Sequence, residues 1–565
     1  MLKIGCLWVL VLCGAVACGG EGNASSETGG ASSTSGGNGS GGNGSGGQST
    51  GGAPSGSGGA VGVSGMVGSG GANATGGAMN ANGGSVSGGA PSAGGTNAGG
   101  SVGTGGSTAA GGMGAGGRGS SGGATAAGGA STGGSASGGT GGAATGGVSS
   151  TGGSGGTTEP VCSVKVPAEF QTNTSLPGGN ASVFKESPHF RVNGSASASA
   201  VDTALNHLEA AHACFVDDWC FRTTGLSVKS NTGPYYKTHI NIVGSLDGAA
   251  GVMRYDAGAG LAYLEVLANQ VGVPQVTVHE WGHAMTLSEY NWVDQQRTGA
   301  WWETVANWVA DTYLTSTYCD AARKKFNVAA GSTIIDLNRV IGQSYLMIVS
   351  SQNLYEAWPF LTYLTSNPDN YPGLGKLALQ NLFRQHARNN DTPLHVLEKV
   401  AAPVKVQTIL GRYWARMAYL DIGHPKARDL FFSRRSNLNY ANLDSAGNQT
   451  YSVKAARKPQ YGGANIIPLT GTGEVSVQVT NLGNGLSESN FTATLAIRAT
   501  SGAVRYVDLP NGAGSASVAS TEEASLVVVN TPTKLYQYDA FASTASSPES
   551  IGLNYRVQIT GATPK

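Results

Sequence analysis

Residues 274–285 read PQVTVHEWGHAM, and two histidines lie four positions apart in this stretch. In an α-helix such residues share nearly one face, so the imidazoles of His279 and His283 can reach a single metal ion. Glu280 is displaced around the helix and can accept a proton from a water that the metal activates. Neutral imidazoles at this spacing suit Zn²⁺. The alternative is an amphipathic helix with two structural histidines.

A catalytic zinc needs a third protein ligand, which we expect from a second helix. Residues 301–311 read WWETVANWVAD, a mostly apolar run without Gly or Pro in which Glu303, Asn307 and Asp311 recur at i, i+4 and i+8. We expect Glu303 to bind zinc, and either Asn307 or Asp311 to orient a histidine N–H. The alternative is that Glu303 only favours a helix N-terminus, where the dipole attracts acids.

The motif HEWGH, followed about twenty residues later by Glu303, resembles the gluzincin clan, the thermolysin-like zinc peptidases. The stretch WWETVANW is more similar to less-characterised secreted bacterial domains with the same metal motif. The resemblance covers roughly residues 185–320 and implies a zincin-like fold and peptidase activity. The sequence departs from the thermolysin-like pattern at Asn307, where that pattern has an aspartate. The amide of Asn307 can accept a hydrogen bond from a histidine N–H, but it brings no negative charge.

The resemblance also implies an edge strand that pairs with the substrate backbone. Residues 258–266 are the candidate, with an ordinary inner strand as the alternative. It further implies a Tyr or His that stabilises an oxyanion, and the available residues are Tyr290, Tyr345, Tyr355, His386 and His424. The histidines ahead of the motif are interpreted as structural: His189, His207, His212 and His239.

Residues 1–18 have the pattern of an export signal, with a basic start and an apolar stretch too short to span a bilayer comfortably. The stretch ends in AVAC, which resembles a lipobox and predicts that Cys18 is lipidated and anchors the protein to a membrane. The protein is then an extracytoplasmic bacterial lipoprotein, of the outer membrane or cell surface. The alternative is cleavage at the small residues and free secretion.

Residues 19–158 consist almost entirely of Gly, Ser, Ala, Thr and Asn. This composition cannot bury enough apolar surface to offset its ordering entropy, so we expect a disordered tether. Over the whole chain, 33 basic residues balance 33 acidic ones. The sequence therefore offers no basic field for nucleic acid, which we exclude as a partner.

Four cysteines lie beyond the export signal, at Cys162, Cys214, Cys220 and Cys319. An even number in an oxidising compartment predicts two disulfides, among three possible connectivities. A cysteine zinc site is the alternative, but the spacing Cys-x5-Cys is poor for one.

Residues 159–441 show strand patterns first, at 190–192 and 239–243, and then helical patterns, at 354–364, 375–388 and 404–419. A helix is also expected at 200–215. This order predicts an α+β domain with a sheet lobe and a helical lobe around the metal helix.

Residues 442–565 change to period two, with Val475, Val477 and Val479 alternating with polar residues. Further short strands are expected at 491–497, 526–529 and 555–559. The pattern predicts an all-β sandwich, for which a carbohydrate or another partner is a candidate ligand.

The sequence as a whole predicts a cell-surface zinc peptidase that hydrolyses peptide or protein substrates. One alternative is a non-catalytic adhesion protein with a structural metal and a glycan- or partner-binding β domain. Another is a zinc hydrolase that acts on a different bond, such as a peptidoglycan cross-link.

Overall fold

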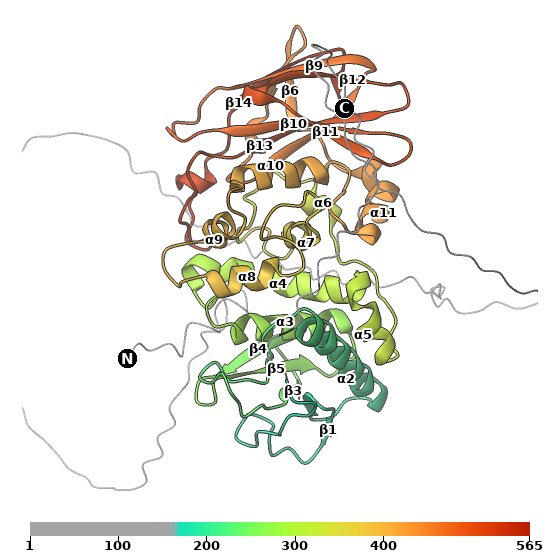
Figure 1. Ribbon diagram of the computed structural model, residues 1–565, viewed down its shortest axis with the longest axis vertical. Coiled ribbons are helices and arrows are strands. Elements are labelled where there is room, and N and C mark those ends of the chain that lie inside the picture. Colours follow the sequence, from blue (N-terminus) through green and yellow to red (C-terminus); the bar gives the residue numbers. More distant parts are fainter. Residues whose placement is uncertain (1–161, 163–165) are drawn as a thin grey trace, which may run out of the picture. The chain divides into compact units, whose positions relative to one another are not determined.

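The computed structural model describes residues 162 and 166–565, which all fall in one compact unit (Figure 1). The predicted export signal, the lipidation site Cys18 and the predicted tether lie outside the described residues. Within the described part of the chain, one sheet near the start is followed by a run of helices and then by two further sheets, so the α+β class is confirmed. None of the helices described is long and apolar enough to cross a membrane.

The first sheet is five-stranded, in the order β1-β2-β3-β5-β4. Its strands are β1 (Phe184–Glu186), β2 (Phe190–Asn193), β3 (Thr238–Val243), β4 (Gly251–Asp256) and β5 (Leu261–Leu267). The strands β2, β3 and β5 are parallel, whereas β1 and β4 run antiparallel at the two edges.

Of the two alternatives for residues 258–266, the structure shows the inner strand, and the edge position is wrong. Residues 258–260 belong to the turn after β4, and residues 261–266 lie in β5, between β3 and β4. A tight turn ends in Gly260, whose φ is +69°, and returns the chain from β4 to β5 as a hairpin. The edge of the sheet beside the helix with the HEWGH motif is therefore β4.

Three long helices follow the order expected from the sequence: α2 (Ala198–His212), α3 (Pro274–Ser288) and α4 (Gln295–Thr315). Helix α3 begins at Pro274, where the missing N–H costs nothing, and Asp294 caps α4 by accepting a hydrogen bond from Gln296 N. Helix α3 carries the histidines and packs against α4 on one side and against β4 and β5 on the other. Helix α3 therefore lies between the sheet and the helical layer, as predicted.

The helical layer consists of shorter helices that follow α4 along the chain. They are α5 (Asp320–Lys325), α6 (Leu337–Val340), α7 (Pro359–Ser366), α8 (Ala378–Gln385), α9 (Pro393–Val400), α10 (Val406–Met417) and α11 (Pro425–Arg434). The helix expected at 354–364 begins only at Pro359. Its predicted first turn is irregular because α4 side chains bind the carbonyls of Leu354 and Tyr355.

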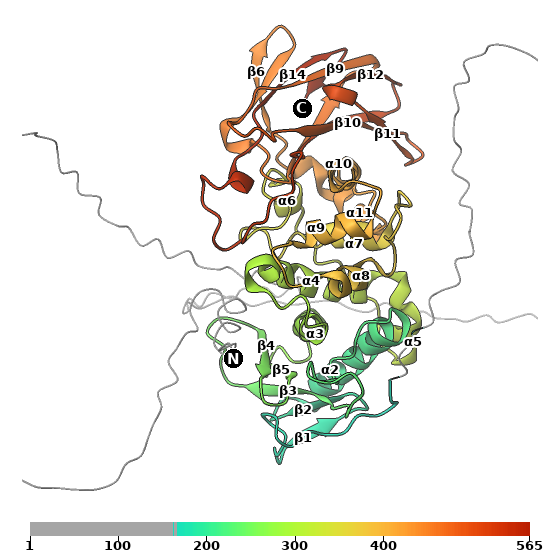
Figure 2. The ribbon, with the colours of Figure 1, turned by 60° about the vertical axis from the view of Figure 1, so that its left-hand side comes forward.

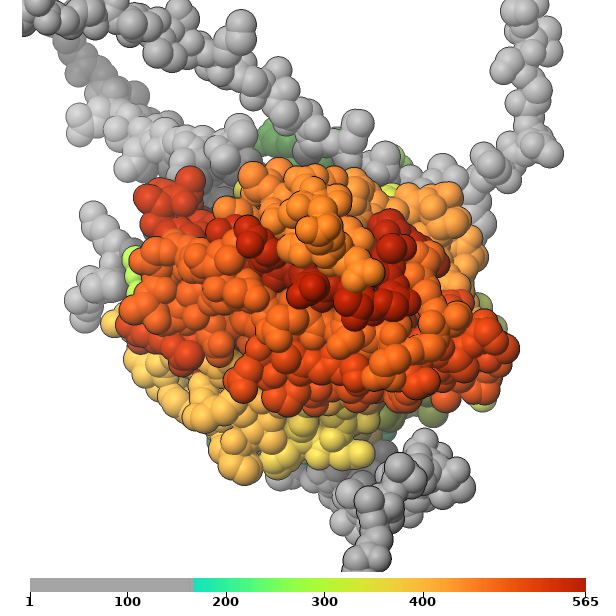
Figure 3. Space-filling model, turned by 90° about the horizontal axis from the view of Figure 1, so that it is seen from above, coloured from blue at the N-terminus to red at the C-terminus, as the bar shows by residue number. Residues whose placement is uncertain are grey.

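Two antiparallel five-stranded sheets follow, with the orders β11-β10-β13-β8-β15 and β12-β9-β14-β7-β6. Their strands are β6 (Leu443–Gly447), β7 (Thr450–Val453), β8 (Ala464–Thr470), β9 (Gly473–Asn481), β10 (Phe491–Arg498), β11 (Val504–Asp508), β12 (Ala513–Val518), β13 (Glu523–Asn530), β14 (Tyr555–Thr560) and β15 (Thr563–Pro564). The face of the unit seen in Figure 3 is formed mainly by these sheets, coloured orange and red.

The sheet that contains β8, β10 and β13 is buried on both faces. Ile467 and Leu495 face the second sheet across a shared core, whereas Ile466 and Val527 belong to the core of the helical layer, against α10. Both views of the ribbon show α10 lying under this sheet (Figures 1 and 2). Burial on two faces explains the continuous apolar runs of these strands, in contrast to the alternation in β9.

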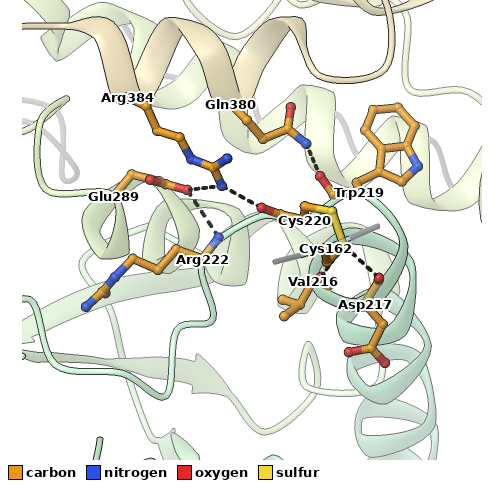
Figure 4. Close-up of a disulfide and its surroundings, with 9 residues drawn as sticks. All are labelled: Cys162, Val216, Asp217, Trp219, Cys220, Arg222, Glu289, Gln380 and Arg384. Atoms are coloured by element: carbon orange, nitrogen blue, oxygen red, sulfur yellow. Dashed lines mark hydrogen bonds and ion pairs between the residues drawn. A yellow bond between two sulfur atoms is a disulfide. The ribbon is translucent and has the colours of Figure 1, made fainter. Parts of the chain in front are cut away.

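The four cysteines form two disulfides, Cys162–Cys220 and Cys214–Cys319. Beside the first, Arg384 of α8 donates to Cys220 O at 2.6 Å and pairs with Glu289 at the end of α3 (Figure 4). The Glu289 carboxylate in turn accepts the backbone N–H of Arg222. This bridge thus lies where the segment after α2, the end of α3 and the helical layer meet.

Candidate metal centre

His279 and His283 on α3 and Glu303 on α4 converge on one point. Their ligand atoms all lie within 4.8 Å of one another, and they form the only such cluster of three His, Cys or acidic residues found in residues 162 and 166–565. His283 and Glu303 are buried, each with about 2% of its surface exposed. The spacing within α3 and the expected position of Glu303 on α4 thus bring together the three side chains singled out as ligands.

The distances between the three donor atoms fit a tetrahedral metal. The two imidazole Nε2 atoms lie 3.1 Å apart, and Glu303 Oε2 lies 3.2 Å from His279 Nε2 and 3.3 Å from His283 Nε2. Ligands on a tetrahedral zinc, with bonds of roughly 2.0–2.1 Å, are about 3.3 Å apart. Three donors at these separations can therefore share one ion without rearrangement.

Three buried or partly buried ligand atoms gather here, and a carboxylate is among them. Glu303 Oε2 is buried and has no well-aligned hydrogen bond among the described residues. A buried carboxylate oxygen without a hydrogen-bond donor is costly, and either a proton on a neighbouring histidine or a bound cation offsets that cost. One divalent ion would satisfy all three atoms, so the residues present fit zinc.

Asn307 orients His279. The Nδ1 atom of His279 lies 2.8 Å from Asn307 Oδ1, and Asn307 Nδ2 donates to Tyr355 O at 2.6 Å. The second contact fixes the amide with its oxygen toward the histidine. His279 therefore keeps a proton on Nδ1, and Nε2 is the atom that faces the centre and would bind a metal.

Asp311 does not contact the motif histidines, so of the two alternatives for an orienting residue the structure brings only Asn307 to the site. Its carboxylate is fully buried and accepts hydrogen bonds from Thr333 Oγ1 and Ile334 N at 2.7 and 2.8 Å. The same carboxylate pairs with His424 Nε2 at 2.5 Å. Two helical turns separate it from Glu303, which is too far along α4 for a shared contact.

Glu280 is buried between α3 and the edge strand β4. Burial raises the pKa of its carboxyl, although the two histidines oppose this shift and the backbone N–H of Met253 donates to it. The close approach depends on Gly251, because a Cβ at that position would lie 2.8 Å from Glu280 Cγ. A raised pKa brings the group toward the range in which a carboxyl can both accept and release a proton.

The charges of the candidate ligands His279 and Glu303 are strongly coupled. Burial alone would lower the pKa of His279, but the carboxylates of Glu303 and Glu280 outweigh it and raise the pKa to about 9. Burial would raise the pKa of Glu303, but the two imidazoles lower it to about 2. Without a metal, the site therefore holds a proton on His279 beside an ionised Glu303 at neutral pH.

We expect zinc binding to release this proton. Below the His279 pKa of about 9, binding should release about one proton from that residue, so zinc affinity should rise about tenfold per pH unit and level off near pH 9. Calorimetry in buffers of different ionisation enthalpy measures the protons released. No release at pH 8 would contradict the raised pKa.

Among the five candidates for an oxyanion donor, the structure places Tyr355 beside the site. Its ring lies 6.4 Å from that of His279, nearly parallel, and its side chain is 49% exposed. Thr304 Oγ1 donates to Leu354 O and Asn307 binds Tyr355 O, so α4 holds this segment at two consecutive carbonyls. Neither Thr304 nor Gly251 was singled out by the sequence, which shows no motif at either position.

The other four candidates for the oxyanion donor contact residues outside the cluster of His279, His283 and Glu303. His386 contacts the carbonyls of Asn291 and Asp391, and His424 pairs with Asp311. The side chain of Arg457 lies over the Tyr345 ring and that of Arg388 lies over the Tyr290 ring. The earlier histidines contact structural partners as well: His189 binds Glu209, His207 binds Tyr313, His239 approaches Pro177 O, and His212 stacks on His189.

Neither a curated protein nor a solved structure matches the chain. The model of a family of unknown function, DUF6055, matches residues 185–565, from the first strand through the candidate metal centre to the last strand. The match covers well over half of the sequence, and the chain therefore belongs to the DUF6055 family.

Proposed function

We propose that this protein is a zinc-dependent peptidase with a zincin-like site. His279, His283 and Glu303 would hold the ion, and the observation that carries the proposal is the spacing of their donor atoms, 3.1 to 3.3 Å. When bound, zinc would supply a Lewis acid that polarises a carbonyl and acidifies a water. The buried acid next to the first histidine supports hydrolysis rather than a purely structural site.

The side chains have distinct tasks in this proposal. Glu280 takes a proton from the attacking water and returns it to the leaving amine, which its raised pKa favours. Asn307 keeps the His279 ring in the tautomer that leaves Nε2 free to bind. Tyr355 stabilises the negative charge that develops on the substrate oxygen.

The outer edge of β4 would align an extended substrate. Leu267 donates its backbone N–H to Ala250 O, and in an antiparallel pair only every second residue bonds to the neighbouring strand. The backbone N–H and C=O groups of Gly251, Met253 and Tyr255 therefore point away from β5, toward the open edge of the sheet. Met253 N already donates to Glu280. A peptide added at this edge would pass directly beside the general base.

We propose export and membrane anchoring through Cys18, with residues 19–158 as the tether and peptides or proteins outside the cytoplasm as substrates. The two disulfides support an oxidising compartment. A carbohydrate or partner bound by residues 442–565 stays a prediction.

A digest of a broad peptide library, with and without a zinc chelator, tests the proposal. We expect cleavage that the chelator abolishes and added zinc restores. Zinc retained without cleavage of any peptide would reject the peptidase and favour the adhesion protein. Cleavage of a peptidoglycan cross-link alone would favour the other hydrolase.

Replacing Tyr355 with Phe should lower kcat by about 10²–10³-fold, the loss seen when one oxyanion donor is removed, with little effect on KM. Zinc affinity should not change, because the Tyr355 contact with Asn307 uses the backbone carbonyl. The matched control is Tyr318→Phe, since Tyr318 is similarly exposed and lies beyond α4. A kcat unchanged by Tyr355→Phe would remove this residue from the mechanism.

A further inference from the structure

The two disulfides differ in their exposure to solvent. Cys214 and Cys319 are fully buried, whereas Cys162 and Cys220 are both partly exposed. Thiol–disulfide exchange begins when a thiolate reaches one of the two sulfur atoms, so its rate depends on access. A reductant can therefore reach the Cys162–Cys220 bridge much more easily than the other bridge.

The surroundings of this bridge can accommodate the reduced cysteines. Cys162 Sγ lies 3.1 Å from the carbonyl oxygen of Asp217 (Figure 4). A thiol at this position can donate a weak hydrogen bond to that oxygen, whereas a disulfide sulfur has no proton to donate. The φ of Cys220 is +60°, in the left-handed region that residues other than glycine rarely adopt. Opening the bridge thus gives the Cys162 thiol a partner and removes a covalent constraint from Cys220.

Polar contacts join the chain after this bridge to the C-terminal end of α3 (Figure 4). Arg384 donates to Cys220 O at 2.6 Å and lies 3.6 Å from the carboxylate of Glu289, the residue that follows α3. Glu289 accepts the backbone N–H of Arg222 at 3.1 Å. The Arg222 guanidinium donates to Ser288 O at 2.8 Å, and Ser288 Oγ donates to Arg222 O at 3.1 Å. The last turn of α3 is therefore held by residues 220–222.

This end of α3 lies close to a candidate metal ligand. His283 precedes the last residue of the helix, Ser288, by five positions, or about 7.5 Å along the axis. Burial raises the pKa of the Glu289 carboxyl, and the charge of Arg384 is the largest influence that opposes this shift. A shift of Cys220 would move Arg384 away from this buried carboxyl and loosen the turn that follows His283.

We propose that the Cys162–Cys220 bridge is a redox switch for the metal centre. A dithiol reductant opens this bridge while Cys214–Cys319 stays closed, and the opening loosens the end of α3 and weakens zinc binding. The last of these effects rests on the zinc site of the proposed function, whereas the first two do not.

The chemistry of the opening is thiol–disulfide exchange. One thiolate of the reductant forms a mixed disulfide with one cysteine and releases the other as a thiolate. The second thiol of the reductant then displaces the first cysteine. Two electrons and two protons pass to the cysteines, and the reductant leaves as a cyclic disulfide.

Alkylation of the folded protein after graded treatment with dithiothreitol tests the selectivity. Peptide mass spectrometry should show Cys162 and Cys220 modified at a reductant concentration at least about tenfold lower than Cys214 and Cys319, because access governs the exchange. Equal modification of all four cysteines, or of none, would overturn the proposal.

Hydrogen exchange of peptides that cover residues 284–290 tests the effect on α3. These amides should exchange at least about tenfold faster after reduction, because the helix end opens locally. The variant Cys162→Ala/Cys220→Ala should show the same fast exchange with and without reductant. Exchange that reduction leaves unchanged would contradict the coupling.

A variant that keeps the bridge separates the route from the disulfide itself. Arg384→Gln removes the link between Cys220 and Glu289, so it should raise the exchange of the α3 end while the bridge stays closed. The matched control is Arg505→Gln, a similarly exposed arginine that pairs with Glu522 on the C-terminal sheets. The control should keep the slow exchange, and equal effects of the two variants would reject the route through Arg384.

Zinc affinity, measured by competition with a chelator, tests the effect on the centre. Protein that has been reduced, alkylated and freed of reductant should bind zinc at least about threefold more weakly, a smaller loss than the roughly 10–100-fold of a direct orienting partner. The variant Cys162→Ala/Cys220→Ala should show a similar loss without any alkyl group. Unchanged affinity in both samples would overturn the switch. Alkylation and hydrogen exchange require neither zinc nor turnover, so failure of the proposed peptidase leaves their results decisive for the opening of the bridge.

Discussion

Replacing Glu280 with Gln should abolish peptide hydrolysis and leave zinc bound. The amide has the shape of the carboxyl but cannot accept the proton of the attacking water, and loss of a general base costs about 10²–10⁴-fold in kcat. Zinc affinity should persist, because the three side chains assigned as ligands are untouched. Turnover of a peptide identified in the library digest gives kcat, and metal analysis of the same protein sample gives the amount of bound zinc.

The matched control for this variant is Glu398→Gln on α9, an identical change at an acid that pairs with Lys405 away from the centre. It should keep full activity. Undiminished turnover by Glu280→Gln would reject the proposed mechanism. Loss of zinc together with activity would instead show that Glu280 acts as a ligand.

Replacing Glu303 with Gln should lower zinc affinity by more than about 100-fold. Even a partner that only orients a metal ligand is worth roughly 10–100-fold in affinity, and a direct ligand should exceed that range. The variant also removes the nearby charge that raises the pKa of His279, so the proton release expected on zinc binding should shrink. Competition with a zinc chelator gives the affinity, and circular dichroism verifies the fold.

Asp311→Asn is the informative control, because it alters a buried carboxylate on the same helix. It should lower the melting temperature, since Asp311 binds Thr333, Ile334 and His424, but it should keep the wild-type zinc affinity. Equal losses of zinc in both variants would mean that Glu303 contributes only to the fold.

The parts of the site that follow from one helix could be predicted from the sequence. The spacing of His279 and His283 sets their common face, and the polar positions on the next helix identified Glu303 and Asn307. Asp311 shares that pattern, but it lies one turn beyond Asn307 and two turns beyond Glu303, where it meets a different set of partners. The helical spacing therefore identified the candidate site residues on α4, and only the tertiary contacts show which of them lie at the site.

Residues that matter through contacts between distant segments could not be predicted. Gly251 approaches Glu280 only because a hairpin places β4 at the sheet edge, and Arg384 reaches the end of α3 from the helical layer. The strand β4 carries Arg254 and Asp256 and shows no clear alternation of apolar residues. The disulfide pairing likewise depends on which cysteines the folded chain brings together.

The bridge between Cys162 and Cys220 has a mechanical consequence. A pull on the chain ahead of Cys162 is transmitted through the sulfur atoms to residue 220, so β1, β2 and α2 carry no load. Cys214 and Cys319 join the same region covalently to the turn after α4. If the protein is held at a surface by its N-terminus, tension reaches the folded part of the chain at residue 220, after β1 and β2 in the sequence. The disulfide therefore prevents a pull from peeling β1 and β2 off the first sheet.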